Sequence, residues 1–297
     1  MNTLITGITG LLGTALVEEN KKNKTLKGIY IGNYQMPHDE FVEYSICDVT
    51  DNNELFNNFR DDKIDTIIHA AGIASTDICE REPERCYVSN VVGTKNVIEL
   101  AHRKKAKLVY ISTNAIFDGD NAPYCEEDKP NPINRYGEAK LACELLVGEN
   151  LKNYLIIRPI LMYGLNNPNE RKCFYFWILE KLQNRESINV VDDVFENPLL
   201  SYQCAEVIWK LIDKDATGIY HIAGRDVLSR YEAANAIAKV FSLDAALINP
   251  VSSKSFPNIA PRPKNTSYRT TKIERELGII PFGFEEGLLL LKKRVSI

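Results

Sequence analysis

The 297-residue sequence lacks a long apolar run, a strong excess of one charge, and a cysteine pattern typical of metal sites. No stretch approaches the roughly 18 apolar residues of a membrane-spanning helix, so we expect neither a membrane span nor a signal peptide. With 36 Lys and Arg against 40 Asp and Glu, the net charge of −4 argues against nucleic acid as a partner. Seven scattered cysteines without a C-x-x-C pair predict no metal and reduced thiols in the cytoplasm.

Short apolar runs alternate with amphipathic stretches along the first half of the chain. The runs predict buried strands at residues 2–6, 26–32, 66–72, 107–113 and 154–160. The stretches between them predict helices near residues 11–20, 51–60, 84–104 and 136–149. This alternation predicts an α/β fold with a Rossmann-type, doubly wound parallel sheet, in which ligands bind at the carboxyl ends of the strands.

The character of the sequence changes after Gly164. We expect residues 1–165 to form a dinucleotide-binding domain, with segments near 190–225 returning to it. Residues 166–297 are expected to form mostly a smaller C-terminal substrate-binding domain. Within it, "SRYEAANAIAKVF" predicts a helix in which Ser229 is the N-cap and Glu232 completes a capping box.

Three glycines follow the first predicted strand in "TGITGLLG". Gly7, Gly10 and Gly13, with Leu11 and Leu12 between them, stand where a strand turns into a helix. Glycines at this place allow a tight turn and let backbone N–H groups approach a pyrophosphate at the positive helix end. The alternative is a turn that only packs helix on strand. We favour a dinucleotide site, because a strand precedes the motif and a helix follows it.

The end of the second predicted strand lacks the acidic residue that often binds a ribose 2′-hydroxyl group. Gly32 and Asn33 occupy this region, in "YIGNYQ". Without a carboxylate, a 2′-phosphate is not repelled. NADP(H) is therefore favoured as the cofactor, with Asn33 beside it, and NAD(H) remains possible because no arginine replaces the acid.

Two other strand ends are candidates for contact with the dinucleotide. Asp48, followed by Val49 in "CDVTD", could accept a hydrogen bond from an adenine amino group, or could simply stabilise a turn. Ala70, Ala71 and Gly72 end the next strand. Their small side chains would let a cofactor lie close to the backbone.

The strand "KLVYIS" delivers Ser112 and Thr113 to the same edge, and Tyr136 and Lys140 follow on a predicted helix. Residues four apart share one helix face. A tyrosine hydroxyl has a pKa near 10, and a nearby ammonium group would lower it. Together with the glycine turn, this order predicts an acid–base site, although a Y-x-x-x-K pattern alone is common.

These motifs resemble those of the extended short-chain dehydrogenase/reductase superfamily over nearly the whole chain. The resemblance rests on T-G-x-x-G-x-x-G, "HAAG", "SNVVGTKNV", the Ser-Thr pair, Y-G-x-x-K and "RPILMYG", in that order. It implies that Asn90 lies near the cofactor. It also implies that the backbone at Pro159 and Ile160 faces the nicotinamide carboxamide.

Several segments are similar to dTDP-4-dehydrorhamnose reductases, among them "ISTNAIFDG", "NRYGEAKLACE" and "APRPKNTSYRTTKIERELG". The resemblance implies reduction of a nucleotide-linked 4-keto-6-deoxy sugar in dTDP-rhamnose biosynthesis. Thr113 would bind the keto oxygen, Tyr136 would donate the proton, and Lys140 would lower the tyrosine pKa and hold the nicotinamide ribose. Asn114 and Ala115 replace the Asp-Tyr pair usual in the family.

Recognition of the nucleotide sugar is expected from the second domain and from the strand-end loop. The candidates for binding the substrate are Ser112, Asn114, Tyr163, Arg171, Arg262 and Lys264. Arg262 is favoured among the cations, because "PRP" resembles a loop of the family. A homodimer is expected by resemblance alone.

Two other functions stay open at the level of sequence. One is a nucleotide-sugar 4-epimerase, which keeps NAD tightly bound and uses the same tyrosine. The other is a non-catalytic, NADP-binding regulatory subunit, because related sequences include a partner of methionine adenosyltransferase.

Overall fold

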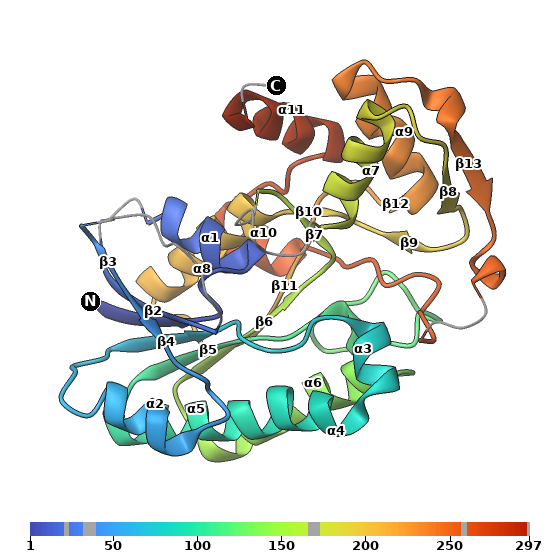
Figure 1. Ribbon diagram of the computed structural model, residues 1–297. Coiled ribbons are helices and arrows are strands. Elements are labelled where there is room, and N and C mark those ends of the chain that lie inside the picture. The colour runs from blue at the N-terminus through green and yellow to red at the C-terminus, as the bar shows by residue number, and fades with distance from the viewer. Residues whose placement is uncertain (21–23, 32–39, 166–172, 257–259, 296–297) are drawn as a thin grey trace.

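A sheet of seven parallel strands forms the centre of the protein in this computed structural model, which describes residues 1–20, 24–31, 40–165, 173–256 and 260–295 (Figure 1). Its strand order is β11-β6-β5-β4-β1-β2-β3. The strands are β1 (Asn2–Thr6), β2 (Thr25–Tyr30), β3 (Val42–Ile46), β4 (Thr66–His69), β5 (Lys107–Ile111), β6 (Tyr154–Pro159) and β11 (Gly218–Ile222). The predicted α/β fold with a doubly wound Rossmann-type sheet is confirmed, and its winding reverses between β1 and β4.

Apolar side chains enter a separate core on each face of the sheet. In β1, Leu4 belongs to one buried cluster and Ile5 to the other. All five residues of β5 are buried. Because successive residues of a strand point to opposite faces, a sheet covered on both sides requires continuous apolar runs. This requirement explains why the runs were recognisable in the sequence.

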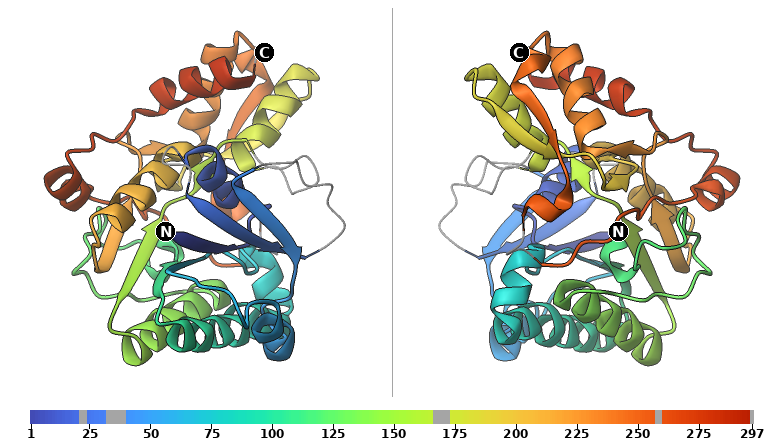
Figure 2. Two further views of the ribbon diagram at one scale, coloured as in Figure 1. Left: turned by 90° about the vertical axis from the view of Figure 1, so that its left-hand side faces the viewer. Right: turned by 90° about the vertical axis from the view of Figure 1, so that its right-hand side faces the viewer.

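Helices cover both faces of the sheet, and Figure 2 shows these layers from two sides. On one face lie α1 (Leu11–Glu18), α8 (Ser201–Asp213) and α10 (Thr271–Leu277). On the other lie α2 (Asn52–Asn58), α3 (Thr76–Arg81), α4 (Pro83–Cys86), α5 (Gly93–Lys104) and α6 (Arg135–Asn150). The helix predicted over residues 84–104 is interrupted, because Tyr87–Val92 forms a π-helical segment, η1, between α4 and α5.

The rest of the chain forms a smaller group of elements beside the sheet (Figure 1). Its helices are α7 (Phe174–Gln183), α9 (Arg230–Phe241) and α11 (Phe284–Val295). Its strand pairs are β7 (Met162–Tyr163) with β10 (Leu199–Leu200), β8 (Ile188–Val191) with β13 (Ile248–Val251), and β9 (Phe195–Glu196) with β12 (Leu228–Ser229). Short 3₁₀ turns occupy Asn114–Ile116 (η2), Ala245–Leu247 (η3) and Ser253–Ser255 (η4).

The predicted capping box at the start of α9 is confirmed, since Ser229 and Glu232 exchange both hydrogen bonds. The division into two domains at residue 165 stays a prediction. Among the described helices, none combines the length and apolar character needed to cross a membrane.

A buried ion pair joins α6 to the sheet. The Arg158 guanidinium group, on β6, donates from Nη2 to Oε2 of Glu144 at 2.7 Å and from Nε to Oε1 at 3.0 Å. The two side chains are only 3% and 4% exposed. Arg158 also contacts Nε2 of His221 on the neighbouring strand β11, at 3.3 Å. Because an unpaired buried charge is costly, this pair fixes α6 relative to β6.

We expect Glu144→Gln to lower the free energy of unfolding by about 3 kcal/mol, since it leaves the Arg158 charge buried without its partner. Urea unfolding followed by circular dichroism measures this loss. The matched control on the same helix is Glu138→Gln, whose partner Arg135 is 60% exposed. That variant should lose less than about 0.5 kcal/mol. Equal losses in the two variants would contradict the role assigned to the buried pair.

Candidate active site

The glycine turn lies between β1 and α1. Gly7 has φ of +71°, and a Cβ atom there would lie 2.8 Å from the backbone nitrogen of Ala71. A Cβ atom on Gly13 would lie 2.5 Å from the carbonyl oxygens of Gly7 and Ile8. Gly10 is the N-cap of α1 and offers no capping side chain. The turn thus presents uncapped N–H groups at the positive end of a helix, which suits a pyrophosphate.

The two leucines of this motif lie at the start of α1 and differ in exposure. Leu12 is buried in the core on that face of the sheet, whereas Leu11 is partly exposed at the first helical position. Leu12 therefore holds the helix against the sheet, while Leu11 lies at the turn itself.

The end of β4 is held against the glycine turn by polar contacts. The N–H of Ala71 donates to Oγ1 of Thr6 at 3.1 Å, and the same oxygen lies 2.7 Å from Nδ1 of His69. Nε2 of His69 contacts the Thr94 hydroxyl at 3.0 Å. Burial, with the charge of Lys140 nearby, lowers the pKa of His69 to about 3. His69 is thus a neutral structural residue, and Ala70 and Ala71 end the strand beside the turn.

Asn90 lies in the π-helical segment and holds the loop that follows β4. Its Oδ1 accepts a hydrogen bond from the N–H of Ile73 at 2.9 Å, and its Nδ2 donates to the carbonyl of Ile73 at 3.2 Å. A Cβ atom on Gly72 would lie 2.4 Å from Oδ1 of Asn90, so the loop approaches the amide closely. Wider helical turns of this kind are common at functional sites. Asn90 thus positions the loop at Gly72.

Thr113, Tyr136 and Lys140 lie together at the carboxyl end of β5. The Thr113 hydroxyl group lies close enough to the Tyr136 hydroxyl group to lower its pKa. Lys140 is 8% exposed, and its Nζ donates to the carbonyl oxygen of Ile111 at 2.5 Å. The same ammonium group lies 4.3 Å from the centre of the Tyr110 ring. The sequence-predicted trio is therefore brought together by β5 and α6.

The pKa of Tyr136 is shifted upward, whereas the sequence predicted a downward shift. Burial raises it to about 12, and the Thr113 hydroxyl group opposes this rise only in part. The sequence predicted that Lys140 would lower it. That lowering stays a prediction, because burial dominates at the phenol and Lys140 donates to Ile111. Tyr136 therefore holds its proton at neutral pH.

The start of α6 explains how Tyr136 reaches Thr113. A Cβ atom on Gly137 would lie 2.1 Å from the carbonyl oxygen of Ala115, so only glycine permits this approach. Asn134 caps the helix by accepting from the N–H of Gly137 at 2.9 Å, and it donates to the carbonyl of Pro261 at 3.0 Å. Our sequence reasoning missed Asn134, although an asparagine before a helical pattern is an N-cap signal.

On the substrate side, Ser112 and Asn114 flank Thr113. The Ser112 hydroxyl is buried and has no hydrogen-bond partner among the described residues. Nδ2 of Asn114 donates to the Thr266 hydroxyl at 2.6 Å, which joins the strand-end loop to the C-terminal part of the chain. Asn114 thus has a structural partner, whereas Ser112 offers a free hydroxyl group.

At the predicted adenosine end, Asp48 is engaged in a local turn. Its Oδ1 accepts from the N–H and from the hydroxyl of Thr50, both at 2.8 Å. Val49 is buried, and a Cβ atom on Gly93 would lie 2.9 Å from its Cγ2. One carboxylate oxygen of Asp48 therefore stabilises a turn, which was one of the two roles considered for this residue. Asn33 lies outside the described residues.

The two predicted cations that the structure describes, Arg262 and Lys264, differ in their surroundings. Arg262 pairs with Asp77 of α3, Nη2 to Oδ2 at 2.8 Å, and it also donates to the carbonyl of Ala260 at 3.1 Å. Lys264 is exposed. The ion pair occupies Arg262 and argues against a free cation for a diphosphate. Arg171 lies outside the described residues.

Tyr163 does not face the candidate site. It is 1% exposed in the core, where its hydroxyl lies 3.5 Å from the carbonyl of Phe284, and burial raises its pKa. This packing argues against the predicted contact with a sugar, which we withdraw. Pro159 ends β6, and the N–H of the buried Ile160 donates to the carbonyl of Ile222 at 3.1 Å.

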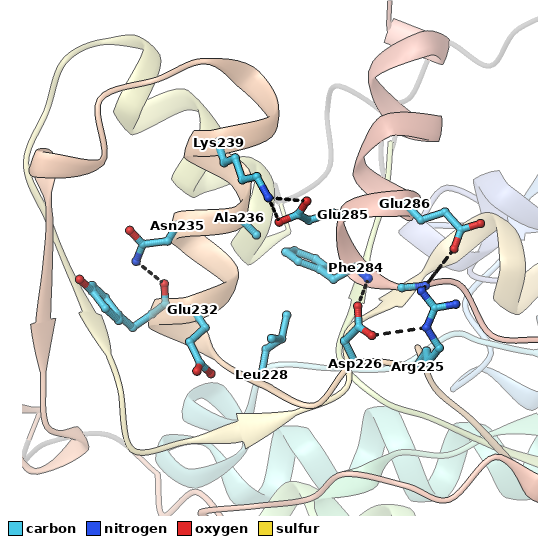
Figure 3. A pocket seen from close by; sticks show the side chains of 12 residues that line it. Arg225, Asp226, Leu228, Glu232, Asn235, Ala236, Lys239, Phe284, Glu285 and Glu286 are labelled. Atoms are coloured by element: carbon cyan, nitrogen blue, oxygen red, sulfur yellow. Dashed lines mark hydrogen bonds and ion pairs between the residues drawn. The ribbon is translucent and has the colours of Figure 1, made fainter.

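A separate hollow of about 640 Å³ lies between α9 and α11 (Figure 3). Two ion pairs line it: Lys239 with Glu285 at 2.8 Å, and Arg225 with Asp226 at 3.5 Å. It contains none of the predicted site residues. We therefore place the candidate site at the strand ends and not in this hollow.

In the part of the chain that the structure describes, no three His, Cys, Asp or Glu residues gather as a metal site would require.

Comparison with known proteins finds similar sequences and structures over almost the whole chain. The family described as RmlD substrate binding domain matches residues 1–296. Methionine adenosyltransferase 2 subunit beta of Xenopus tropicalis is 31% identical over 98% of this chain and 89% of its own length. The dTDP-4-dehydrorhamnose reductase of Aggregatibacter actinomycetemcomitans is 29% identical over 96% of each chain. The solved dTDP-4-dehydrorhamnose reductase of Bacillus anthracis, in complex with NADP, has a TM-score of 0.86 at 29% identity and 99% coverage of both chains.

The buried Lys140 predicts a pH-dependent stability. Burial lowers its pKa from 10.5 to about 8. Between those pH values the unfolded chain binds more protons than the folded chain, so the free energy of unfolding rises with pH. Below pH 8 the protein bears the full cost of burying the charged Lys140. Relative to Lys140→Met, the protein without nucleotide should gain about 3 kcal/mol of unfolding free energy from pH 7.5 to 10.5. Urea unfolding of both proteins at several pH values measures this gain. A difference in unfolding free energy between the two proteins that does not change with pH would contradict the prediction.

Proposed function

This chain belongs to the family described as RmlD substrate binding domain, and on that premise we propose that it is an NADP(H)-dependent reductase. Its substrate would be a nucleotide-linked 4-keto-6-deoxy sugar. The proposal is supported by relatives named dTDP-4-dehydrorhamnose reductase that align with almost the whole chain. The observation that carries it is the placement of Thr113, Tyr136 and the buried Lys140 together at the end of β5, where Nζ of Lys140 donates to the Ile111 carbonyl.

In this proposal Tyr136 is the general acid. Its raised pKa keeps the phenol protonated at neutral pH, as a proton donor requires. The Tyr136 hydroxyl gives its proton to the carbonyl oxygen of the sugar as negative charge develops there. The Thr113 hydroxyl donates a hydrogen bond to the same oxygen. Lys140 supplies a positive charge in the same buried site, which favours the phenolate that remains after proton transfer.

The dinucleotide would bind at the glycine turn, where the structure offers a fitting cradle. The close contacts at Gly7 and Gly13 leave no room for side chains, and the start of α1 presents free N–H groups. When bound, the nicotinamide supplies the hydride. NADP(H) is proposed because the second strand ends without a carboxylate, and a relative is solved with NADP.

For the sugar we propose a pocket at the strand-end loop. The unpartnered Ser112 hydroxyl is the donor that the structure leaves free beside Thr113. Asn114 would shape the pocket through its bond to Thr266, and the exposed Lys264 would lie within reach of a phosphate. The change from the usual Asp-Tyr to Asn114-Ala115 affects this side of the site and bears on the choice of sugar.

We further propose a cytoplasmic homodimer. All seven cysteines are free thiols, in agreement with a reducing compartment. Tyr87, Val88 and Leu145 are exposed on η1 and α6, at 50%, 46% and 59%, and would be covered by a second subunit. Sedimentation velocity of the purified protein tests the dimer.

A regulatory role is the second candidate, because relatives at 31% identity are named methionine adenosyltransferase 2 subunit beta. The presence of Thr113, Tyr136 and the buried Lys140 together at the end of β5 favours catalysis. Co-purification with a methionine adenosyltransferase, together with no oxidation of NADPH by any keto sugar, would favour regulation. Release of bound NAD on denaturation would instead favour the 4-epimerase alternative.

Tyr136→Phe should reduce kcat for the keto sugar by on the order of 10²- to 10⁴-fold, because the proton donor is lost. NADPH affinity should change little, which fluorescence titration checks. Tyr154→Phe is the matched control, since Tyr154 lies at the amino end of β6, whereas the candidate site lies at the carboxyl ends of the strands. It should keep its turnover in an NADPH absorbance assay. Undiminished turnover in Tyr136→Phe would exclude Tyr136 as the acid.

A further inference from the structure

Two thiols, those of Cys79 and Cys86, lie side by side near the candidate site. Nδ2 of Asn90 is 3.3 Å from the Cys86 sulfur and 3.9 Å from the Cys79 sulfur, so one amide group contacts both thiols. Residues seven apart in one helix would be about 10 Å apart along its axis. Here the helix is interrupted at Glu82, between α3 and α4, where φ is −128° and ψ is 64°. This interruption lets the two sulfurs lie against the same Asn90 amide.

The two thiols are chemically unequal. The neighbouring Cys79 thiol and the Asn90 amide lower the pKa of Cys86, although burial opposes them. The same contact raises the pKa of Cys79. A thiolate next to a protonated thiol is the arrangement in which one sulfur attacks an oxidant and its neighbour resolves the product.

The pair is linked to the residues proposed for catalysis. Charge on Cys79 and Cys86 acts on both Tyr136 and Lys140, raising the pKa of each. Asn90, which donates to Cys86, also holds the loop at Ile73. A change of charge or bonding at the two sulfurs therefore reaches the tyrosine, the lysine and the loop behind the dinucleotide site.

We propose that Cys79 and Cys86 are a redox modification site, at which a hydroperoxide forms a reversible disulfide that slows turnover. The Cys86 thiolate attacks the peroxide, which gives a sulfenic acid and an alcohol or water. The Cys79 sulfur then displaces water from Cys86, and the S–S bond forms. Overall, two thiols are oxidised by two electrons and one hydroperoxide is reduced. The effect on turnover rests on the proposed function, whereas the disulfide does not.

Access to the buried sulfurs requires only local opening. Cys79 and Cys86 are 0% and 2% exposed, but α3 has six residues and α4 only four. Short helices with a break between them open at low free energy compared with global unfolding. The neighbouring Arg85 is already exposed. A small peroxide can therefore reach Cys86 without unfolding the sheet.

The test treats the full-length protein with hydrogen peroxide, alkylates the remaining thiols, and maps disulfides by peptide mass spectrometry. We expect a Cys79–Cys86 link, a loss of turnover of at least tenfold relative to each variant's own starting rate, and recovery with dithiothreitol. Cys79→Ala and Cys86→Ala should each resist this reversible loss. Cys125→Ser is the control, because Cys125 is partly exposed, unlike Cys79 and Cys86, and lies outside the pair.

Three results would overturn the proposal. They are oxidation confined to Cys125, inactivation that persists in Cys86→Ala, and a Cys79–Cys86 link that changes neither turnover nor NADPH affinity. Failure of the proposed function is seen separately. In that case no keto sugar is reduced by the untreated protein, while the mass of the linked peptides and NADPH binding still report on the disulfide.

Discussion

The ammonium group of Lys140 lies inside the protein, where Nζ donates to the Ile111 carbonyl and lies over the Tyr110 ring. A buried charge is costly unless fixed partners replace water. Both partners belong to β5, the strand that leads directly to Thr113. Lys140 thus links α6 to the strand end where the hydroxyl groups meet. The same burial lowers the pKa of the lysine and, at Tyr136, keeps the phenol protonated.

Two further contacts keep α6 in this place. At its start, the close approach of Gly137 to the Ala115 carbonyl brings Tyr136 within hydrogen-bond reach of Thr113. Two turns later, Glu144 pairs with Arg158 of the neighbouring strand. The helix is therefore fixed at both ends of the segment proposed for catalysis, as preorganised acid–base chemistry requires. The thiols of Cys79 and Cys86, which we propose as a redox pair, contact Asn90, and their charge acts on the pKa of Lys140.

Local and periodic features were predictable from the sequence, and long-range contacts were not. The strands, the glycine turn and the capping box at Ser229 follow from patterns within a few residues, and the structure confirms the sheet and the cap. The pairing of Arg262 with Asp77 joins residues 185 apart, and no local pattern signals it. The core position of Tyr163 depends on packing against Phe284, from the last helix. The pKa of Tyr136 depends on burial, which spacing along a helix does not reveal.

The most direct test of the account follows the hydrogen that is transferred. The protein is incubated with dTDP-4-dehydrorhamnose and NADPH deuterated at the transferred C4 position, and the sugar product is analysed by mass spectrometry and NMR. The account predicts one deuterium on the carbon of the former keto group for each NADPH oxidised. Binding of both compounds without transfer of deuterium would contradict the proposal that this chain is a reductase.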